Sequence, residues 1–183
     1  MKQHGSRHTR TLTGVIAAGF ISLSDTAFAE DDKAFEFEIS TGVEYSSRVA
    51  VDEVDTVSPN GDLAALFDAG ISFNNELTEK TKIDLGYKFS ATVHDELGQF
   101  DMQSHFGSLD LSHDFGQFDV GIAQRLSQSS LDGADFLTYR QTAPYMTAFF
   151  GERCFVRAEV GFANKEFDTV TERDSDVNSI GAD

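Results

Sequence analysis

Histidine and carboxylate side chains are the groups of this sequence that could carry catalysis or bind a metal ion. His94, Asp95 and Glu96 are consecutive, and together they offer a base and two acids, as a general base or a metal site requires. Their short polar segment favours a solvated loop instead. His105 and His113 are eight residues apart, so on one strand they share a face but lie more than ~20 Å apart, too far to share a metal ion.

Other catalytic patterns are missing from the sequence. No segment matches a phosphate-binding loop, a zinc-ligand spacing or a dinucleotide fingerprint, and no serine and histidine stand out as the pair that a lipid hydrolase needs. The acidic segments 52–55 and 168–176 could collect divalent cations near lipopolysaccharide, but their spacing does not supply the roughly six or more oxygens that calcium takes. The sequence therefore predicts a protein that is not an enzyme and that has no cofactor and no metal site.

A further set of charged residues recurs at alternate positions along predicted strands. Successive side chains of a strand point to opposite faces, so these charges would share one face of a sheet. Their mixed signs favour ion pairs between neighbouring strands. The set fits two interpretations equally, the lining of a pore or translocation path and a hydrated, salt-bridged plug. The predicted lumen-lining residues are Glu36, Glu38, Glu44, Asp68, Lys82, Asp84, Lys88, Asp119, Arg125, Arg157 and Glu159.

The elements that would position this set are seven β-strands. In the first strand, Phe35, Phe37 and Ile39 alternate with Glu36 and Glu38, and the same period of two recurs along the chain. The predicted strands are about 7–14 residues long, a span that brackets the ~9–11 residues with which a tilted strand crosses a bilayer. The predicted strands cover approximately 35–45, 63–73, 81–93, 102–115, 118–125, 136–149 and 156–162.

Two strands carry irregularities, and the links between strands alternate in length. The alternation changes phase near Gly107-Ser108, which predicts a bulge. Pro144 removes a ladder donor, which predicts a bend or a bulge. Short links alternate with longer polar ones, as the turns and loops of outer-membrane barrels do. The short links are 74–79, 114–117 and 150–153, and the long ones are 46–62, 94–101 and 127–135.

The first 29 residues are typical of an export signal. Lys2, Arg7 and Arg10 precede an uncharged apolar stretch, and Ala27-Phe28-Ala29 matches a cleavage site. A helix of about 12 apolar residues is too short to span the ~30 Å hydrocarbon layer of a membrane. The sequence therefore predicts a signal peptide over 1–29 and export from the cytoplasm.

Composition and charge narrow the class of the mature chain. The full sequence has a formal net charge of -17, which disfavours binding to nucleic acid, and its 17 Phe residues, nearly all of them after residue 29, require an apolar environment. Without an apolar run of ~18 residues, only strands could cross a membrane. We predict an all-β fold, an antiparallel transmembrane β-barrel of outer-membrane type over 30–167, followed by an acidic polar tail or truncated loop over 168–183. Its location would be the outer membrane of a Gram-negative bacterium, with lipid, lipopolysaccharide and the barrel-assembly machinery as partners.

The predicted barrel is incomplete. Seven strands is an odd number, whereas bacterial single-chain barrels have an even one, and an open edge in lipid leaves backbone groups unpaired. The sequence therefore predicts a truncated gene product or a barrel that a second chain completes. Cys154 is the only cysteine and cannot form an internal disulfide. An incidental thiol is favoured over a covalent link to a partner.

Several short segments resemble a known family. The chain is similar to the C-terminal β-barrel domain of the surface lipoprotein assembly modifiers, over roughly 62–167. The resemblance implies an outer-membrane protein that helps a surface lipoprotein reach the cell exterior. The segments that carry it are 86–90, 101–105 and 131–133, with Phe136-Leu137 before Pro144.

Three functions are therefore compatible with the sequence. The first is a non-enzymatic outer-membrane β-barrel in transport, translocation or surface assembly. The second is a soluble periplasmic β-sandwich binding protein, because a sandwich strand also alternates. The third is an outer-membrane barrel enzyme that modifies lipid. Strand length, aromatic residues near strand ends and polar faces rich in Gly, Ser and Asp favour the first.

Overall fold

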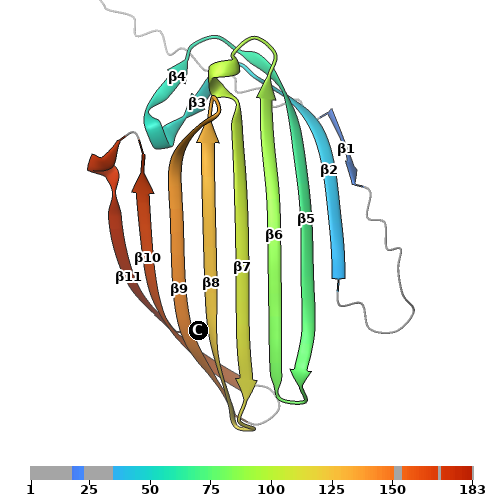
Figure 1. Cartoon of the computed structure of the whole chain (residues 1–183), viewed down its shortest axis with the longest axis vertical. Helices are drawn as coiled ribbons and strands as arrows, with labels where there is room; N and C mark the ends of the chain where they lie inside the picture. The colour runs from blue at the N-terminus through green and yellow to red at the C-terminus, as the bar shows by residue number, and fades with distance from the viewer. Residues whose placement is uncertain (1–17, 23–34, 151–153, 169, 183) are drawn as a thin grey trace, which may run out of the picture.

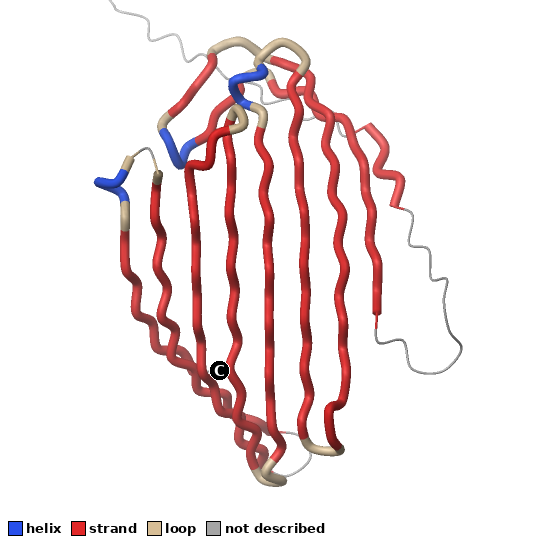
Figure 2. Tube along the Cα trace, in the orientation of Figure 1, coloured by secondary structure: helices blue, strands red, loops and turns tan. Residues whose placement is uncertain are grey.

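The computed structural model describes residues 18–22, 35–150, 154–168 and 170–182. Within these residues the fold is all-β, with one large antiparallel sheet and one small hairpin (Figures 1 and 2). The helical elements of the described residues are three single turns of 3-10 helix, η1 (Asp52–Val54), η2 (Gly98–Phe100) and η3 (Thr171–Arg173). None of the helices among these residues has the length and apolar character to cross a membrane.

Nine strands form the large sheet in chain order, each antiparallel to the next. A separate hairpin of β3 (Val49–Val51) and β4 (Thr56–Ser58) interrupts the chain between the second and third strands of the sheet. The strands of the sheet are β1 (Ala18–Ser22), β2 (Phe35–Ser46), β5 (Asp62–Thr78), β6 (Thr81–His94), β7 (Met102–Asp114), β8 (Phe118–Leu131), β9 (Ala134–Phe150), β10 (Cys154–Phe167) and β11 (Ser175–Ala182).

The sheet has two strands more than the predicted incomplete barrel of seven strands. The seven predicted strands correspond to β2 and β5 to β10, but β1 and β11 are added, one at each edge. β1 falls in the predicted signal peptide, whose cleavage site lies outside the described residues, and β11 falls in the predicted polar tail. In the described part of the chain β1 and β11 do not pair, so the sheet is open and not a closed barrel.

The long strands are more regular than the sequence predicts. The bulge expected near Gly107-Ser108 is absent, because β7 keeps one register with both of its neighbours. The change of phase arises because Phe106 lies on the same face as the polar residues, not because the backbone shifts. Opposite Pro144 the β9–β10 ladder skips two residues and resumes in the same register, as the missing N–H requires. The register shift of β9 lies elsewhere, opposite Ser129 and Ser130.

The link between β8 and β9 is a tight turn. Asp132 and Gly133 have φ angles of 51° and 73°, as the two central residues of a type I′ turn require. The long loop predicted over 127–135 is therefore wrong, since β8 continues to Leu131 and β9 begins at Ala134. The predicted short link at 150–153 lies largely outside the described residues.

The register sorts the sheet into two chemically different faces. Ladder pairs connect five polar residues into one row across the sheet, Ser40, Asp68, Ser90, Ser104 and Ser129. Their side chains point to the same side of the sheet, which we call the polar face. The residues between them in each strand form the apolar face. Most of that face is exposed and hydrophobic, as at Phe35, Phe37, Ile39, Phe67, Leu85, Leu111, Val120, Met146, Val160 and Phe162.

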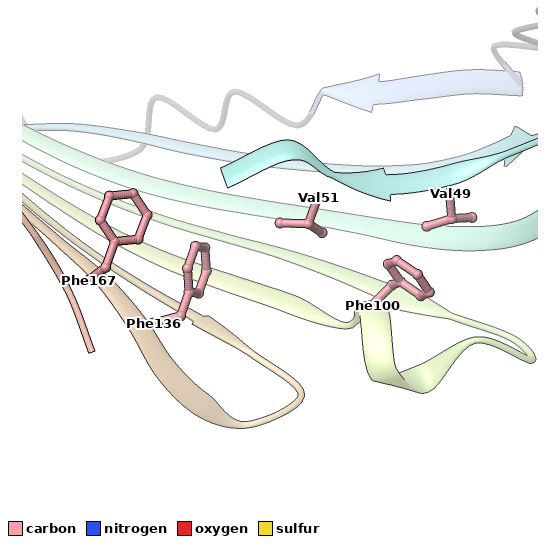
Figure 3. Packing of buried hydrophobic residues seen from close by; sticks show 5 residues of the cluster. All are labelled: Val49, Val51, Phe100, Phe136 and Phe167. Atoms are coloured by element: carbon pink, nitrogen blue, oxygen red, sulfur yellow. The ribbon is translucent and has the colours of Figure 1, made fainter. Parts of the chain in front are cut away.

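The main buried cluster lies at the loop end of the sheet, on the polar face. Val49 and Val51 of the β3–β4 hairpin face Phe100, Phe136 and Phe167, and all five are buried (Figure 3). We call these five residues the mouth cluster. The hairpin therefore covers one end of the polar face and leaves the apolar face uncovered by any other described element.

Candidate functional site

The predicted lumen-lining residues all fall on the polar face. Ladder pairs connect them row by row, for example Lys82 with Ser112, then Gly121, Tyr145 and Glu159. The set holds seven acidic and four basic residues. These charges come from β2, β5, β6, β8 and β10. Because they share one face of the sheet, the polar face is the candidate functional surface of the protein.

Asp68 is the centre of one polar group on this face. Lys88 Nζ lies 3.3 Å from Asp68 Oδ1, Ser90 Oγ donates to the same oxygen at 2.7 Å, and Ser40 Oγ donates to Asp68 Oδ2 at 3.4 Å. These contacts join β2, β5 and β6. The contact between Lys88 and Asp68 is a cross-strand ion pair of the kind that the mixed signs of the sequence predict.

A second group, the Tyr145 cluster, joins β7 to β10. Arg157 Nη2 donates to Glu159 Oε2 at 3.1 Å, and the Arg157 guanidinium lies 3.7 Å from the centroid of the Tyr145 ring. The Tyr145 hydroxyl donates to Asp110 Oδ1 at 2.6 Å. Tyr145 is 9% exposed and lies over Gly121, where a Cβ atom would be 2.3 Å from the ring Cζ. The cluster fills part of the polar face with a stacked and hydrogen-bonded aromatic side chain.

Gly121 is needed for this packing. The Tyr145 ring is held by Arg157 and Asp110, so it cannot move cheaply to make room for a methyl group. We expect Gly121→Ala to lower the free energy of unfolding by roughly 1–3 kcal/mol, as overpacking does. Urea titration followed by the loss of the folded gel band measures this change. Gly107→Ala is the matched control, since nothing lies within 4 Å of a Cβ atom there, and equal effects of the two substitutions would contradict the packing argument.

The rest of the lining set is less well neutralised. Arg125 Nη1 donates to Gln141 Oε1 at 3.2 Å, and Lys82 pairs with Glu76 at 3.2 Å in an exposed contact of little energetic weight. Asp84 lies opposite Asp110, and Asp119 opposite Asp114, so like charges face each other. Among the described residues, no ion pair forms at Glu36, Glu38, Glu44, Asp84 or Asp119. The polar face therefore has an excess of negative charge.

Asp62 is the first residue of β5 and lies at the loop end of the sheet. Its side chain binds the backbone of the β6–β7 loop. The residue is 5% exposed, and its carboxylate accepts hydrogen bonds from the backbone N–H groups of Leu63 at 2.8 Å, Glu96 at 3.0 Å and Leu97 at 2.8 Å. Burial raises the pKa of Asp62, but the three N–H donors and the nearby His94 outweigh burial and hold the pKa below the usual 3.8. The ionised form therefore anchors the loop.

His94 is separated from the acidic residues beside it in the sequence. Its side chain is 9% exposed, with Nδ1 3.6 Å from Asp101 Oδ1 and without a hydrogen bond, whereas Asp95 and Glu96 are exposed. A cavity of about 280 Å³ lies here between hairpin and polar face, lined among others by Glu44, Arg48 and His94. Within the described ranges no three His, Cys, Asp or Glu side chains are grouped to hold a metal ion.

The other two candidate histidines lie on the apolar face. His105 Nδ1 is 2.7 Å from the Tyr87 hydroxyl, and His113 Nδ1 is 2.8 Å from Thr81 Oγ1. Each ring has its own partner, and the two rings lie on one strand as the sequence predicts. Cys154 is exposed at the turn end of β10 and forms no disulfide.

Protein-family models, curated proteins and solved structures contain no match to this chain. The polar face, the apolar face and the mouth cluster are therefore the features of the molecule that bear on its function.

Sequence reasoning missed two members of the Tyr145 cluster. Neither Tyr145 nor Asp110 belongs to the predicted lining set, although both lie on the polar face. Two features of the pairing point to Tyr145. It lies opposite the small residue Gly121 on one neighbouring strand, and on the other it lies opposite Glu159, on the same face as Arg157.

Proposed function

We propose that this chain is a non-enzymatic β-barrel protein of the outer membrane, exported by the segment 1–29, that acts in transport, translocation or surface assembly. Its apolar face contacts lipid and lipopolysaccharide, and its polar face stays hydrated. The barrel-assembly machinery inserts it. A surface lipoprotein is the proposed cargo or partner, in keeping with the resemblance of 62–167 to the surface lipoprotein assembly modifiers.

The extent of the exposed apolar face supports a lipid environment. Phe35, Phe37 and Ile39 are 56%, 55% and 49% exposed, and comparable side chains continue across the sheet. Soluble monomers rarely expose apolar patches larger than a few hundred Å². Nine apolar residues are buried among the described ones, and three of them are alanines. A soluble β-sandwich needs a second sheet over the apolar face, and the only other described sheet lies on the polar face.

The direction of the apolar band is the observation that carries the proposal. On β2 the apolar stretch covers 35–45, centred at Ser40, and ladder pairs carry the row of Ser40 to Phe167 of β10. The apolar stretch of β10 covers 156–162 and is centred at Glu159. This centre lies eight residues from Phe167, toward the β9–β10 turn. Between β2 and β10 the centre of the apolar band therefore shifts by about 26 Å along the strand direction, while the six strand spacings between them span about 29 Å across the sheet.

This slope of roughly 42° lies within the ~35–45° by which strands tilt in outer-membrane barrels. An apolar band that is level in a membrane must cross tilted strands diagonally. Sheet packing in a sandwich imposes no such diagonal band. The match between slope and tilt therefore favours strands that cross a bilayer.

Fractionation of the exported protein tests the proposal. We expect the protein in the outer-membrane fraction, with a gel mobility that changes on boiling in detergent. Recovery in the osmotic-shock fluid would support the soluble β-sandwich and contradict the proposal. Lipase activity of the purified protein, lost on substitution of a serine of the polar face, would support the lipid-modifying enzyme instead.

A further inference from the structure

The free edge of β2 is the place where the sheet could close. In the full chain β1 pairs with this edge at Ser40, Thr41 and Val43. β1 lies within the predicted signal peptide, so cleavage after Ala29 removes it. Among the strands that the structure describes, β2 then lies at one edge of the sheet and β11 at the other.

The strands that remain have the right number and direction for closure. β2 and β5 to β11 are eight strands, an even number, as single-chain bacterial barrels have. Each is antiparallel to the next, so β2 and β11 also run in opposite directions. We propose that, once β1 is removed, β11 pairs with β2 and closes an eight-stranded barrel from a single chain, an inference that rests on the proposed membrane location and signal peptide.

Contacts at the loop end of the sheet already link its first and last strands. Arg173 of η3, just before β11, donates from Nη1 to the carbonyl oxygen of Glu53 at 2.6 Å and forms an ion pair with Asp55. Both partners lie in the segment that follows β2. Phe167 at the end of β10 packs with Val49 and Val51 of the hairpin in the same segment. Polar and apolar contacts therefore hold the β10–β11 connection against the β2–β5 connection.

The slope of the apolar band also fixes the register of closure. The apolar band shifts by eight residues over the six strand steps from β2 to β10, which extrapolates to a shift of about ten or eleven residues over the eight steps of a closed barrel. Only an even shift pairs the apolar face of β11 with the apolar face of β2. An offset of about ten places Ile180 opposite Val43 on the apolar face and Ser179 opposite Glu44 on the polar face. Ser40 to Val43 is the part of β2 that β1 occupies. The leader strand and β11 therefore compete for the same edge.

Disulfide trapping in the full exported chain tests this closure. Glu44→Cys and Ser179→Cys are combined with Cys154→Ser, and membranes are oxidised with copper phenanthroline. Directly opposite residues have Cβ atoms about 4.5–5.5 Å apart, so we expect an intrachain disulfide with a reductant-sensitive gel shift. In the control, Glu38→Cys replaces Glu44→Cys on the same face, about 20 Å lower on β2, and we expect at least about tenfold less cross-linking.

The outcomes separate the inference from the proposed function. Blocking cleavage with Ala29→Asp is expected to reduce the intrachain cross-link, because β1 then stays on β2. A protein that is in the membrane but forms an interchain dimer, or no cross-link, would overturn single-chain closure and leave the membrane location standing. A protein in the soluble fraction would overturn the proposed function itself.

Discussion

Ile39→Arg is expected to remove most of the folded protein from the membrane. Ile39 lies near the centre of the apolar stretch of β2 and is 49% exposed. An Arg on the lipid face near the bilayer midplane costs about 2–4 kcal/mol, which corresponds to a decrease of roughly 30-fold to several hundred-fold in the equilibrium for folding into the bilayer. Refolding of the purified protein into vesicles across a urea series measures this effect directly.

The neighbouring residue supplies the matched control. Ser40 lies on the polar face, within hydrogen-bonding distance of Asp68, so Ser40→Arg places the same side chain in a wet, acidic environment. We expect its effect on folding to be several-fold smaller than that of Ile39→Arg. If the chain were a soluble protein, an exposed residue such as Ile39 would tolerate Arg within about ±0.5 kcal/mol. Equal, small effects at both positions would therefore contradict the membrane proposal.

The two faces of the sheet follow from the sequence because alternation is a local property. Glu36 and Glu38 are placed opposite to Phe35 and Phe37 by the pleat of one strand, whatever that strand pairs with. The same reasoning assigns Lys88 and Asp68 to one face, and the register then brings them into contact. Period-two patterning therefore predicts which residues share the candidate site.

The parts that the sequence did not reveal depend on contacts between distant segments. β11 is rich in Ser, Asp and Asn and has few apolar residues, so its alternation is weak, and it becomes a strand by pairing with β10. The β3–β4 hairpin is ordered by Phe100 and Phe136, which are far from it in the chain. The turn at Asp132-Gly133, by contrast, has a local signal, because Asp-Gly is a preferred pair for the two central residues of a type I′ turn.

Closure with eight strands would restrict what the polar face can do. The interior of an eight-stranded barrel is just wide enough to be filled by side chains. The Tyr145 cluster occupies part of the polar face, which would line this interior, and the hairpin covers the loop end of that face. A closed barrel of this kind holds no open path for a protein cargo. Among the roles that we propose, surface assembly through the mouth is therefore favoured over passage through the lumen.

Phe136→Ala is expected to release the hairpin from the sheet. Phe136 is 4% exposed in the mouth cluster, next to the register shift of β8 and β9, and loss of a buried Phe side chain costs about 3–5 kcal/mol. The β3–β4 hairpin should become sensitive to protease while the long strands stay folded. Because the cluster also holds β10 beside the hairpin, the cross-link between positions 44 and 179 should weaken in the same variant. Phe106→Ala is the control, since Phe106 lies on the polar face with 36% exposure. A hairpin that remains protected in Phe136→Ala would show that the mouth cluster does not hold the two ends of the sheet together.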